Sequence, residues 1–189
     1  MLSRQFQTLL YLKNSTISAH LLQLHSLILK TALHRDQYFV SKFILSSCSL
    51  SLKFTKSFFD SLLPLDPPPP LFAFNTLIRE FSKSSSPMES VKLFSQLQWV
   101  GLKPDKFTYP FVLKSCGRCS VIRVGGVMHL LVFKMCFDSD RHVQNMLLRM
   151  YAGCRAIGFA RMVFDEMCNR DVVSWSSMIA GYISWYNVF

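Results

Sequence analysis

Residues 106–140, KFTYPFVLKSCGRCSVIRVGGVMHLLVFKMCFDSD, are matched without a gap by residues 2–36, LSRQFQTLLYLKNSTISAHLLQLHSLILKTALHRD. In this alignment Asp36 falls on Asp140, and the similarity continues into the block that follows each segment. Self-similarity over units of this length is typical of stacked repeats, in which each unit buries its apolar face against its neighbours. The sequence therefore predicts a repeat array.

The segment between these two blocks shows how one unit folds. Ser86-Pro87-Met88-Glu89 has the pattern of a capping box with proline at the first helical position, and Gly101 ends the helix that follows. Between them, apolar residues recur every three positions, which is typical of one helical stripe. Residues 75–83 form a shorter amphipathic run before the cap. The unit is predicted to be helix–turn–helix.

The same plan recurs toward the C-terminus. Helices are expected at residues 109–116, 121–133, 143–151 and 157–167. Turns are expected at Gly117 and Gly153, and the Gly125-Gly126 pair is expected to need close packing. Because alternating strand patterns are absent, the predicted fold class is all-α: a right-handed superhelical solenoid of helix–turn–helix repeats with about nine helices.

Composition limits the classes of partner. The 189 residues carry a net charge of +10 and are 50% hydrophobic. This charge favours nucleic acid or an anionic membrane surface, although a generally basic organellar or nuclear protein would show it too. No apolar run is long enough for a membrane span. The first 35 residues lack Asp and Glu, which suits an organellar transit segment, but they also align with a repeat, so both interpretations stay open.

Neither a metal site nor an enzyme is expected. The six cysteines lie in apolar, helix-patterned segments and are predicted to be reduced. Cys116-Gly-Arg-Cys119 could be a metal or redox pair. A zinc site needs about four ligands, however, and no second matching pair follows, so an incidental pair at a helix end is favoured. No Ser/His/Asp, metal or phosphate-loop constellation is present, and we expect no catalytic residues and no cofactor.

Residues 71–105, LFAFNTLIREFSKSSSPMESVKLFSQLQWVGLKPD, resemble a pentatricopeptide repeat in their length, their Asn-Thr-Leu-Ile and Lys-Leu-Phe stretches and their Gly-x-x-Pro-Asp ending. Residues 106–140 are similar to the long variant of that repeat and residues 141–171 to the short variant. This order is the pattern of the plant PLS subfamily. The remaining units implied by the resemblance are a degenerate long repeat at 1–36, overlapping the candidate transit segment, a short repeat with a Pro-rich loop at 37–70, and a truncated repeat at 172–189.

The resemblance implies a function in RNA recognition. Such repeats read single-stranded RNA one base per repeat, as in plant organellar editing and processing factors. It therefore implies organellar RNA as partner, editing or processing proteins as further partners, and a mitochondrial or chloroplast location. The C-terminal extension and deaminase-like domain of the subfamily have no counterpart here. A helical-repeat protein scaffold and a non-functional truncated gene product are the alternatives.

In the family, the fifth and last residues of a repeat contact the base edge, and the second residue packs against its face. The resemblance thus assigns base reading to Asn75 with Asp105 and to Asn145 with Asp171, a combination that implies a pyrimidine, usually uridine. The further residues implied are Phe72 and Phe107, His142 and Val173 as flanking residues, and Pro110 with Asp140 as a weaker reader. From the residues alone, helix starts and N-caps are the favoured interpretation of these Asn and Asp positions; the resemblance favours base reading instead, and both roles can coexist.

Overall fold

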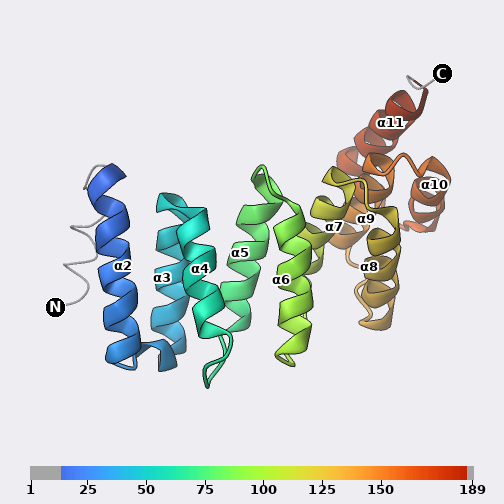
Figure 1. Cartoon of the computed structure of the whole chain (residues 1–189). Coiled ribbons are helices and arrows are strands. Elements are labelled where there is room, and N and C mark those ends of the chain that lie inside the picture. Colours follow the sequence, from blue (N-terminus) through green and yellow to red (C-terminus); the bar gives the residue numbers. More distant parts are fainter. Residues whose placement is uncertain (1–13, 187–189) are drawn as a thin grey trace. The chain divides into compact units, whose positions relative to one another are not determined.

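The computed structural model describes residues 14–186, and their side chains from residue 22 onward. Within this range the chain forms ten α-helices and one 3-10 turn, without a strand (Figure 1). The prediction of an all-helical fold is confirmed, with one helix more than the approximate count expected. Residues 1–13 of the predicted first repeat lie outside the described range. The elements are α2 (Asn14–Lys30), η1 (Leu33–Arg35), α3 (Gln37–Leu50), α4 (Leu52–Leu62), α5 (Leu71–Lys83), α6 (Met88–Trp99), α7 (Tyr109–Arg118), α8 (Ile122–Lys134), α9 (Arg141–Gly153), α10 (Ile157–Glu166) and α11 (Val172–Tyr186).

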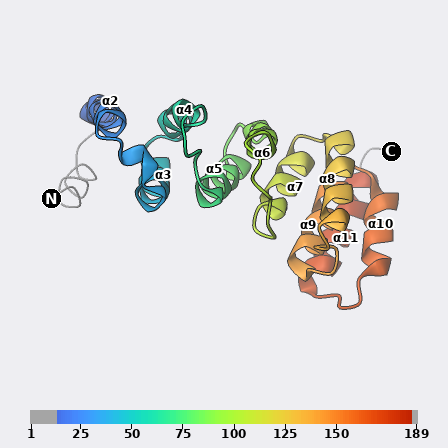
Figure 2. The ribbon, with the colours of Figure 1, turned by 90° about the horizontal axis from the view of Figure 1, so that it is seen from below.

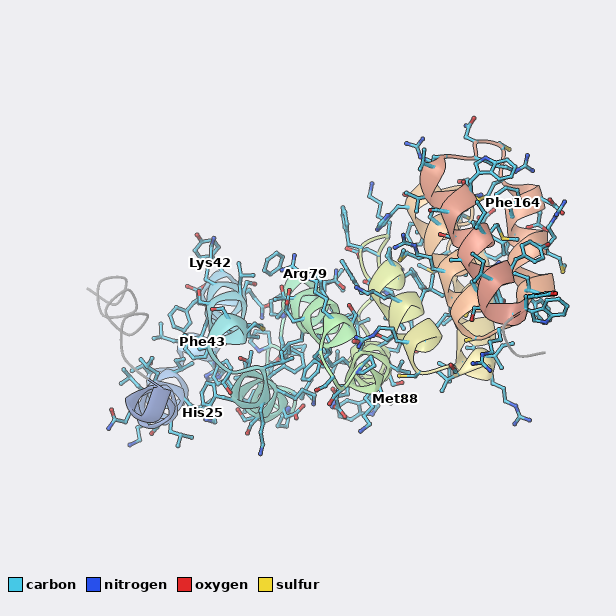
Figure 3. The ribbon with its side chains drawn as sticks, turned by 90° about the horizontal axis from the view of Figure 1, so that it is seen from above. His25, Lys42, Phe43, Arg79, Met88 and Phe164 are labelled. Carbon is cyan, nitrogen blue, oxygen red and sulfur yellow. The ribbon has the colours of Figure 1, made fainter. Side chains whose placement is uncertain are left out.

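The chain divides into two compact units, Met1–Leu77 and Ile78–Phe189. The first unit is built around an aromatic cluster between α2, α3 and α4. The Phe43 and Phe58 ring centroids lie 4.6 Å apart, and His25 meets Phe58 edge-on at 5.1 Å. Figure 3 labels His25, on α2, and Phe43, on α3. The His25 Nε2 atom also lies 2.9 Å from the Ser61 hydroxyl. Apolar residues on one face of each helix thus bury one another, as a repeat array requires.

The second unit has two layers of helices. Helices α7, α9 and α11 pack in series, each against the next, and form one layer (Figures 1 and 2). Helices α8 and α10 lie against this layer, and α6 packs on α7. The helices predicted at 109–116, 121–133, 143–151 and 157–167 are found as α7 to α10, and no end differs by more than two residues. This arrangement, with the first helix of each pair stacked on the next, is that of a helical repeat protein.

Gly117 and Gly153 do not form the turns that the sequence predicts. Both lie within the last turns of α7 and α9, where the two backbones touch. A Cβ atom on Gly153 would lie 2.9 Å from the Gly117 carbonyl oxygen, so no side chain fits at this crossing. The positive φ angles that reverse the chain belong instead to Ser120 (54°) and Arg155 (58°). A helix crossing, not a turn, explains the two glycines.

Gly125 meets its predicted requirement for close packing. A Cβ atom there would overlap the Met150 thioether of α9. Its neighbour Gly126 has open space around it, with nothing within 4 Å of the same position. The prediction is therefore confirmed for Gly125 and wrong for Gly126.

The predicted capping box at α6 is not formed. The helix starts at Met88 without a side-chain cap, and the Ser86 carbonyl accepts from the Glu89 N–H at 3.1 Å. Because Pro87 already has helical dihedral angles, a backbone turn takes the place of the hydroxyl cap. The Glu89 carboxylate pairs with Lys92 at 2.7 Å instead of reaching back. The predicted end at Gly101 is confirmed, with a φ of 77°.

Candidate nucleic-acid interface

A hydrogen-bonded part of the candidate surface joins α9 to the start of α11. Asn145, on α9, is 5% exposed, and its Nδ2 atom donates to Asp171 Oδ2 at 3.2 Å and Oδ1 at 3.3 Å. Asp171 also accepts from the Ser174 N–H at 2.9 Å, which caps α11. The Arg141 Nε atom lies 3.9 Å from Asp171 Oδ2. The structure thus brings together two residues that the sequence assigns to one base.

The protonation state of Asp171 fixes the orientation of Asn145. The hydrogen bond from the Ser174 N–H, together with those from Asn145 and the Val173 N–H, lowers the pKa of Asp171 below its ordinary value. An ionised carboxylate only accepts hydrogen bonds, so Asn145 presents its NH₂ group to it. The Asn145 Oδ1 atom is then buried without a partner among the described residues. A buried acceptor in this state can be satisfied by an ordered water molecule or by a donor from a ligand.

Of the other two candidate aspartates, Asp140 is the N-cap of α9, and Asp105 closes a turn just before α7. Asp105 Oδ1 accepts from the Phe107 and Thr108 N–H groups, each at 2.9 Å. Asp140 Oδ1 accepts from the His142 N–H at 2.9 Å and the Val143 N–H at 3.2 Å. The interpretation as a helix N-cap is confirmed for Asp140 and wrong for Asp105, because Thr108 is the N-cap residue of α7. Contact with a base stays a prediction, since a cap uses only part of a carboxylate's accepting capacity.

The residues predicted to flank a base are accessible. Phe72 and Phe107 are 52% and 62% exposed, and Val173 is 37% exposed. His142 is exposed as well, one residue into α9 from its start. Exposed aromatic rings are suitable surfaces for stacking with unpaired bases.

Asn75 and Pro110 differ in the contacts that their side chains can make with a base. Asn75 is half-buried on α5 in the first unit, where its amide can donate and accept hydrogen bonds. Pro110 is buried in the first turn of α7 in the second unit. Its side chain has no polar atom, so it can only make apolar contacts with a base. Pro110 is therefore placed for packing and not for hydrogen-bond readout.

A basic groove between α7 and α9 was not recognised from the sequence. It has a volume of about 400 Å³, and Lys114, Arg118 and Arg149 line it. Arg118 Nη1 donates to the Ser82 carbonyl at 2.6 Å, and Arg149 Nε donates to the Ser177 hydroxyl at 3.3 Å, so both guanidinium groups are held in place. The remaining lining residues are Pro110, Phe111, Gly117, His142, Met146 and Gly153. A signal was available, because Lys114 and Arg149 occupy the same place in the predicted repeats 106–140 and 141–171.

The cysteine pair lies at the end of α7, as the sequence predicts. Burial is the main cause that raises the pKa of the Cys116 thiol to about 12, and the nearby Cys154 adds to it. Cys154 Sγ lies 3.7 Å from the Cys116 carbonyl oxygen.

Among residues 14–186, no three His, Cys, Asp or Glu side chains are grouped so as to hold a metal ion. None of the helices in this range has both the length and the apolar character needed to cross a bilayer.

Comparison with known proteins identifies relatives along most of the chain. No family model matches it. One pentatricopeptide repeat-containing protein of Arabidopsis thaliana is 37% identical over 181 residues, 96% of this chain and 36% of that protein. A second from the same plant is 34% identical over 89% of this chain and 24% of its own length.

A third relative from Arabidopsis thaliana, named as mitochondrial, is 32% identical over 97% of this chain and 32% of its own length. The chain thus spans about a third of the length of these relatives, or less. The similarity covers helices from both units, and the stacked helix pairs described above are the architecture that the repeats require. The chain belongs to the pentatricopeptide repeat proteins.

Proposed function

We propose that this chain binds single-stranded RNA and selects bases with side chains from consecutive repeats. The observation that carries the proposal is the buried pair of Asn145 and Asp171, with an unpartnered amide oxygen beside an ionised carboxylate. The proposal takes residues 71–105, 106–140 and 141–171 as successive repeats. The same roles are proposed for Asn75 and Asp105 in the preceding standard repeat.

Hydrogen-bond chemistry accounts for the proposed preference between the two pyrimidines, while the preference for a pyrimidine itself rests on the family resemblance. Asn145 Oδ1 needs a donor, and uracil offers its N3–H, whereas the N3 atom of cytosine is an acceptor. Cytosine can donate only from its exocyclic amino group, which lies at another place on the base edge. Uridine is therefore the favoured base and cytidine the second choice. His142 and Val173, both accessible, would pack against the two faces of that base.

The basic groove supplies the part of the affinity that does not depend on sequence. Lys114, Arg118 and Arg149 place positive charge between α7 and α9, close to His142 at the groove's rim. Arginine and lysine that neutralise phosphates release counterions, so affinity falls as salt rises. Base selection and backbone attraction would then come from different residues of one surface.

A titration of fluorescent RNA oligomers at two salt concentrations tests the proposal. We expect binding that weakens steeply with salt and that prefers uridine at one position. Lys114→Ala combined with Arg149→Ala should weaken binding to all oligomers and reduce the salt slope by about two. Lys53→Ala with Lys92→Ala, two lysines of α4 and α6, is the control for lost charge alone. A chain that binds no RNA but captures a protein would favour the scaffold alternative.

We also propose that the RNA is organellar and that the chain serves editing or processing, with partner proteins from that machinery. The mitochondrial name of one relative supports an organelle without choosing between mitochondrion and chloroplast. Import of the labelled chain into isolated mitochondria and chloroplasts, followed by protease treatment, tests the location. Protection in neither organelle contradicts it.

A further inference from the structure

Arg141 shares the Asp171 carboxylate with Asn145. It is the first residue of α9 and stands one helical turn before Asn145, so the two side chains leave the same face of the helix. Both approach one atom, because Asp171 Oδ2 lies 3.2 Å from Asn145 Nδ2 and 3.9 Å from Arg141 Nε. The Arg141 side chain is also 65% exposed. A base that contacts Asn145 would thus lie within reach of the Arg141 guanidinium.

The pair of Asn145 and Asp171 meets only part of the hydrogen-bonding demand of uracil. Uracil presents its N3–H donor between two carbonyl acceptors, O2 and O4. Asn145 Oδ1 can accept from N3–H, but the Asn145 NH₂ group is already turned toward Asp171, and an ionised carboxylate has no proton to donate. A carbonyl oxygen that loses water without gaining a donor weakens binding. A further donor beside Asn145 would complete the recognition of uracil.

Arg141 has the chemistry of such a donor. A guanidinium group carries only donors and remains charged at physiological pH. At 3.9 Å, the contact between Arg141 Nε and Asp171 Oδ2 is an ion pair and not a hydrogen bond. Within residues 22–186, no hydrogen bond occupies the Arg141 guanidinium. Its terminal NH₂ groups are therefore available to a ligand.

The surroundings of Arg141 restrain its side chain without fixing it. Arg141 also lines a cavity of about 610 Å³, whose wall includes Asp138 and Glu166. Neither of these two carboxylates forms an ion pair among the described residues, but their charge and that of Asp171 attract the guanidinium toward the start of α9. Helix stability does not account for Arg141, because a cation in the first turn opposes the helix dipole.

We propose that Arg141 is a third base-contacting residue, whose guanidinium donates to O4 of the uracil that Asn145 binds through N3–H. The proposal rests on the proposed RNA-binding function. O4 is the acceptor at the open end of the base edge, whereas O2 lies beside the ribose. Cytosine carries an amino group in place of O4, and its N–H donors would face those of Arg141. Arg141 is therefore a specificity-determining residue that favours uridine over cytidine.

Chemical changes in the base, combined with a change in the protein, test the proposal. Affinities of the unaltered chain and of Arg141→Ala are measured for RNA oligomers with uridine, cytidine or 4-thiouridine at the selected position. Sulfur accepts hydrogen bonds weakly, so the unaltered chain should bind the 4-thiouridine oligomer less tightly than the uridine oligomer. Arg141→Ala should lower the affinity for the uridine oligomer about tenfold and for the other two far less. The difference between uridine and 4-thiouridine should then disappear.

Arg123→Ala is the matched control, because Arg123 is an exposed arginine in the first turn of α8. It should change the three affinities by one small, common factor. If Arg141→Ala instead weakens binding to all three oligomers equally and reduces the salt slope by about one, Arg141 contacts a phosphate and the proposal is wrong. Unchanged affinities would also contradict it, while a uridine preference of the unaltered chain would still support the proposed function.

Failure of the unaltered chain to bind any oligomer would contradict the proposed function itself, and the role of Arg141 with it. Circular dichroism and thermal unfolding of Arg141→Ala and Arg123→Ala show whether each variant is folded. A folded Arg141→Ala that still distinguishes uridine from 4-thiouridine as well as the unaltered chain does would exclude the contact with O4.

Discussion

The side-chain amide of Asn145 donates to both carboxylate oxygens of Asp171, at 3.3 Å and 3.2 Å, and so connects α9 to the cap of α11. The two residues that the repeat pattern assigns to one base are therefore a single hydrogen-bonded unit. A change in either residue alters the orientation of the other. Their contributions to base selection should be strongly non-additive.

Asn145→Ala should relax base preference at one nucleotide by about tenfold and leave the salt dependence nearly unchanged, since no phosphate contact is lost. Affinities for oligomers varied one position at a time provide the measurement. Gln144→Ala, at the adjacent half-buried position of α9, is the control. An equal loss of affinity for every oligomer would show that Asn145 has a structural role only.

Asn75→Ala should have the same kind of effect at a different nucleotide. One complete repeat separates the predicted units of Asn75 and Asn145, so the two affected positions should lie two nucleotides apart. The same oligomer series measures this distance. A single shared position, or adjacent positions, would contradict the proposed repeat boundaries.

Asp140→Ala should lower the free energy of unfolding by about 1 kcal/mol, because the His142 and Val143 N–H groups lose their cap. Asp140→Asn keeps a capping oxygen and should cost a few tenths of that amount or less. Urea denaturation followed by circular dichroism measures both. If Asp140→Asn keeps the stability but changes the base preference, then the Asp140 side chain both caps α9 and contacts a base. Equal destabilisation by the two variants would rule out the cap as the cause.

Stability should depend on the ionisation of Asp171 at low pH. Its pKa in the folded state is lowered, first by the Ser174 N–H, so the ionised form stabilises the fold. This contribution is complete above the unfolded-state pKa of about 3.9 and is lost as pH falls through the folded-state pKa. Asp171→Asn should therefore be less stable than the unaltered chain at pH 7, and the difference should shrink below about pH 4.

Thermal unfolding at a series of pH values provides the comparison for Asp171. Asp165→Asn, which removes an exposed ion pair with Arg161, is the control and should produce a smaller difference at pH 7. A difference between the unaltered chain and Asp171→Asn that stays constant from pH 7 to pH 2 would be inconsistent with the predicted linkage.

Gly153→Ala and Gly117→Ala should each destabilise the second unit by about 1–3 kcal/mol, because a methyl group would press on the facing backbone. Gly126→Ala is the matched control, since it lies in α8 with nothing within 4 Å of the new atom. It should stabilise the chain by about 0.5–1 kcal/mol through helix propensity. Chemical denaturation measures the free energy of unfolding of the three variants. Equal changes in all three would mean that the α7–α9 crossing is not tight.

The sequence predicted what depends on local pattern. The positions of α7 to α10 followed from apolar periodicity, and the aligned residues Asp36 and Asp140 indeed cap equivalent helices. Local pattern could not show why residue 117 is a glycine, because the cause is close contact with the backbone of α9, which belongs to another repeat. The Asn145–Asp171 hydrogen bond likewise joins residues on separate helices. The missed cations Lys114 and Arg149 needed the tertiary fold to show that they line one groove.

The contact between Gly117 and Gly153 also determines how this surface can respond to a ligand. Backbone atoms are already in contact at the C-terminal ends of α7 and α9, so those ends cannot move closer. Pro110 and His142, in the first turns of α7 and α9, line the groove toward the other end of the two helices. A change in the angle between the two helices that keeps the Gly117–Gly153 contact would therefore alter their spacing most near His142. Such a change would alter the distance between the proposed binding positions while the contact between the glycines is kept.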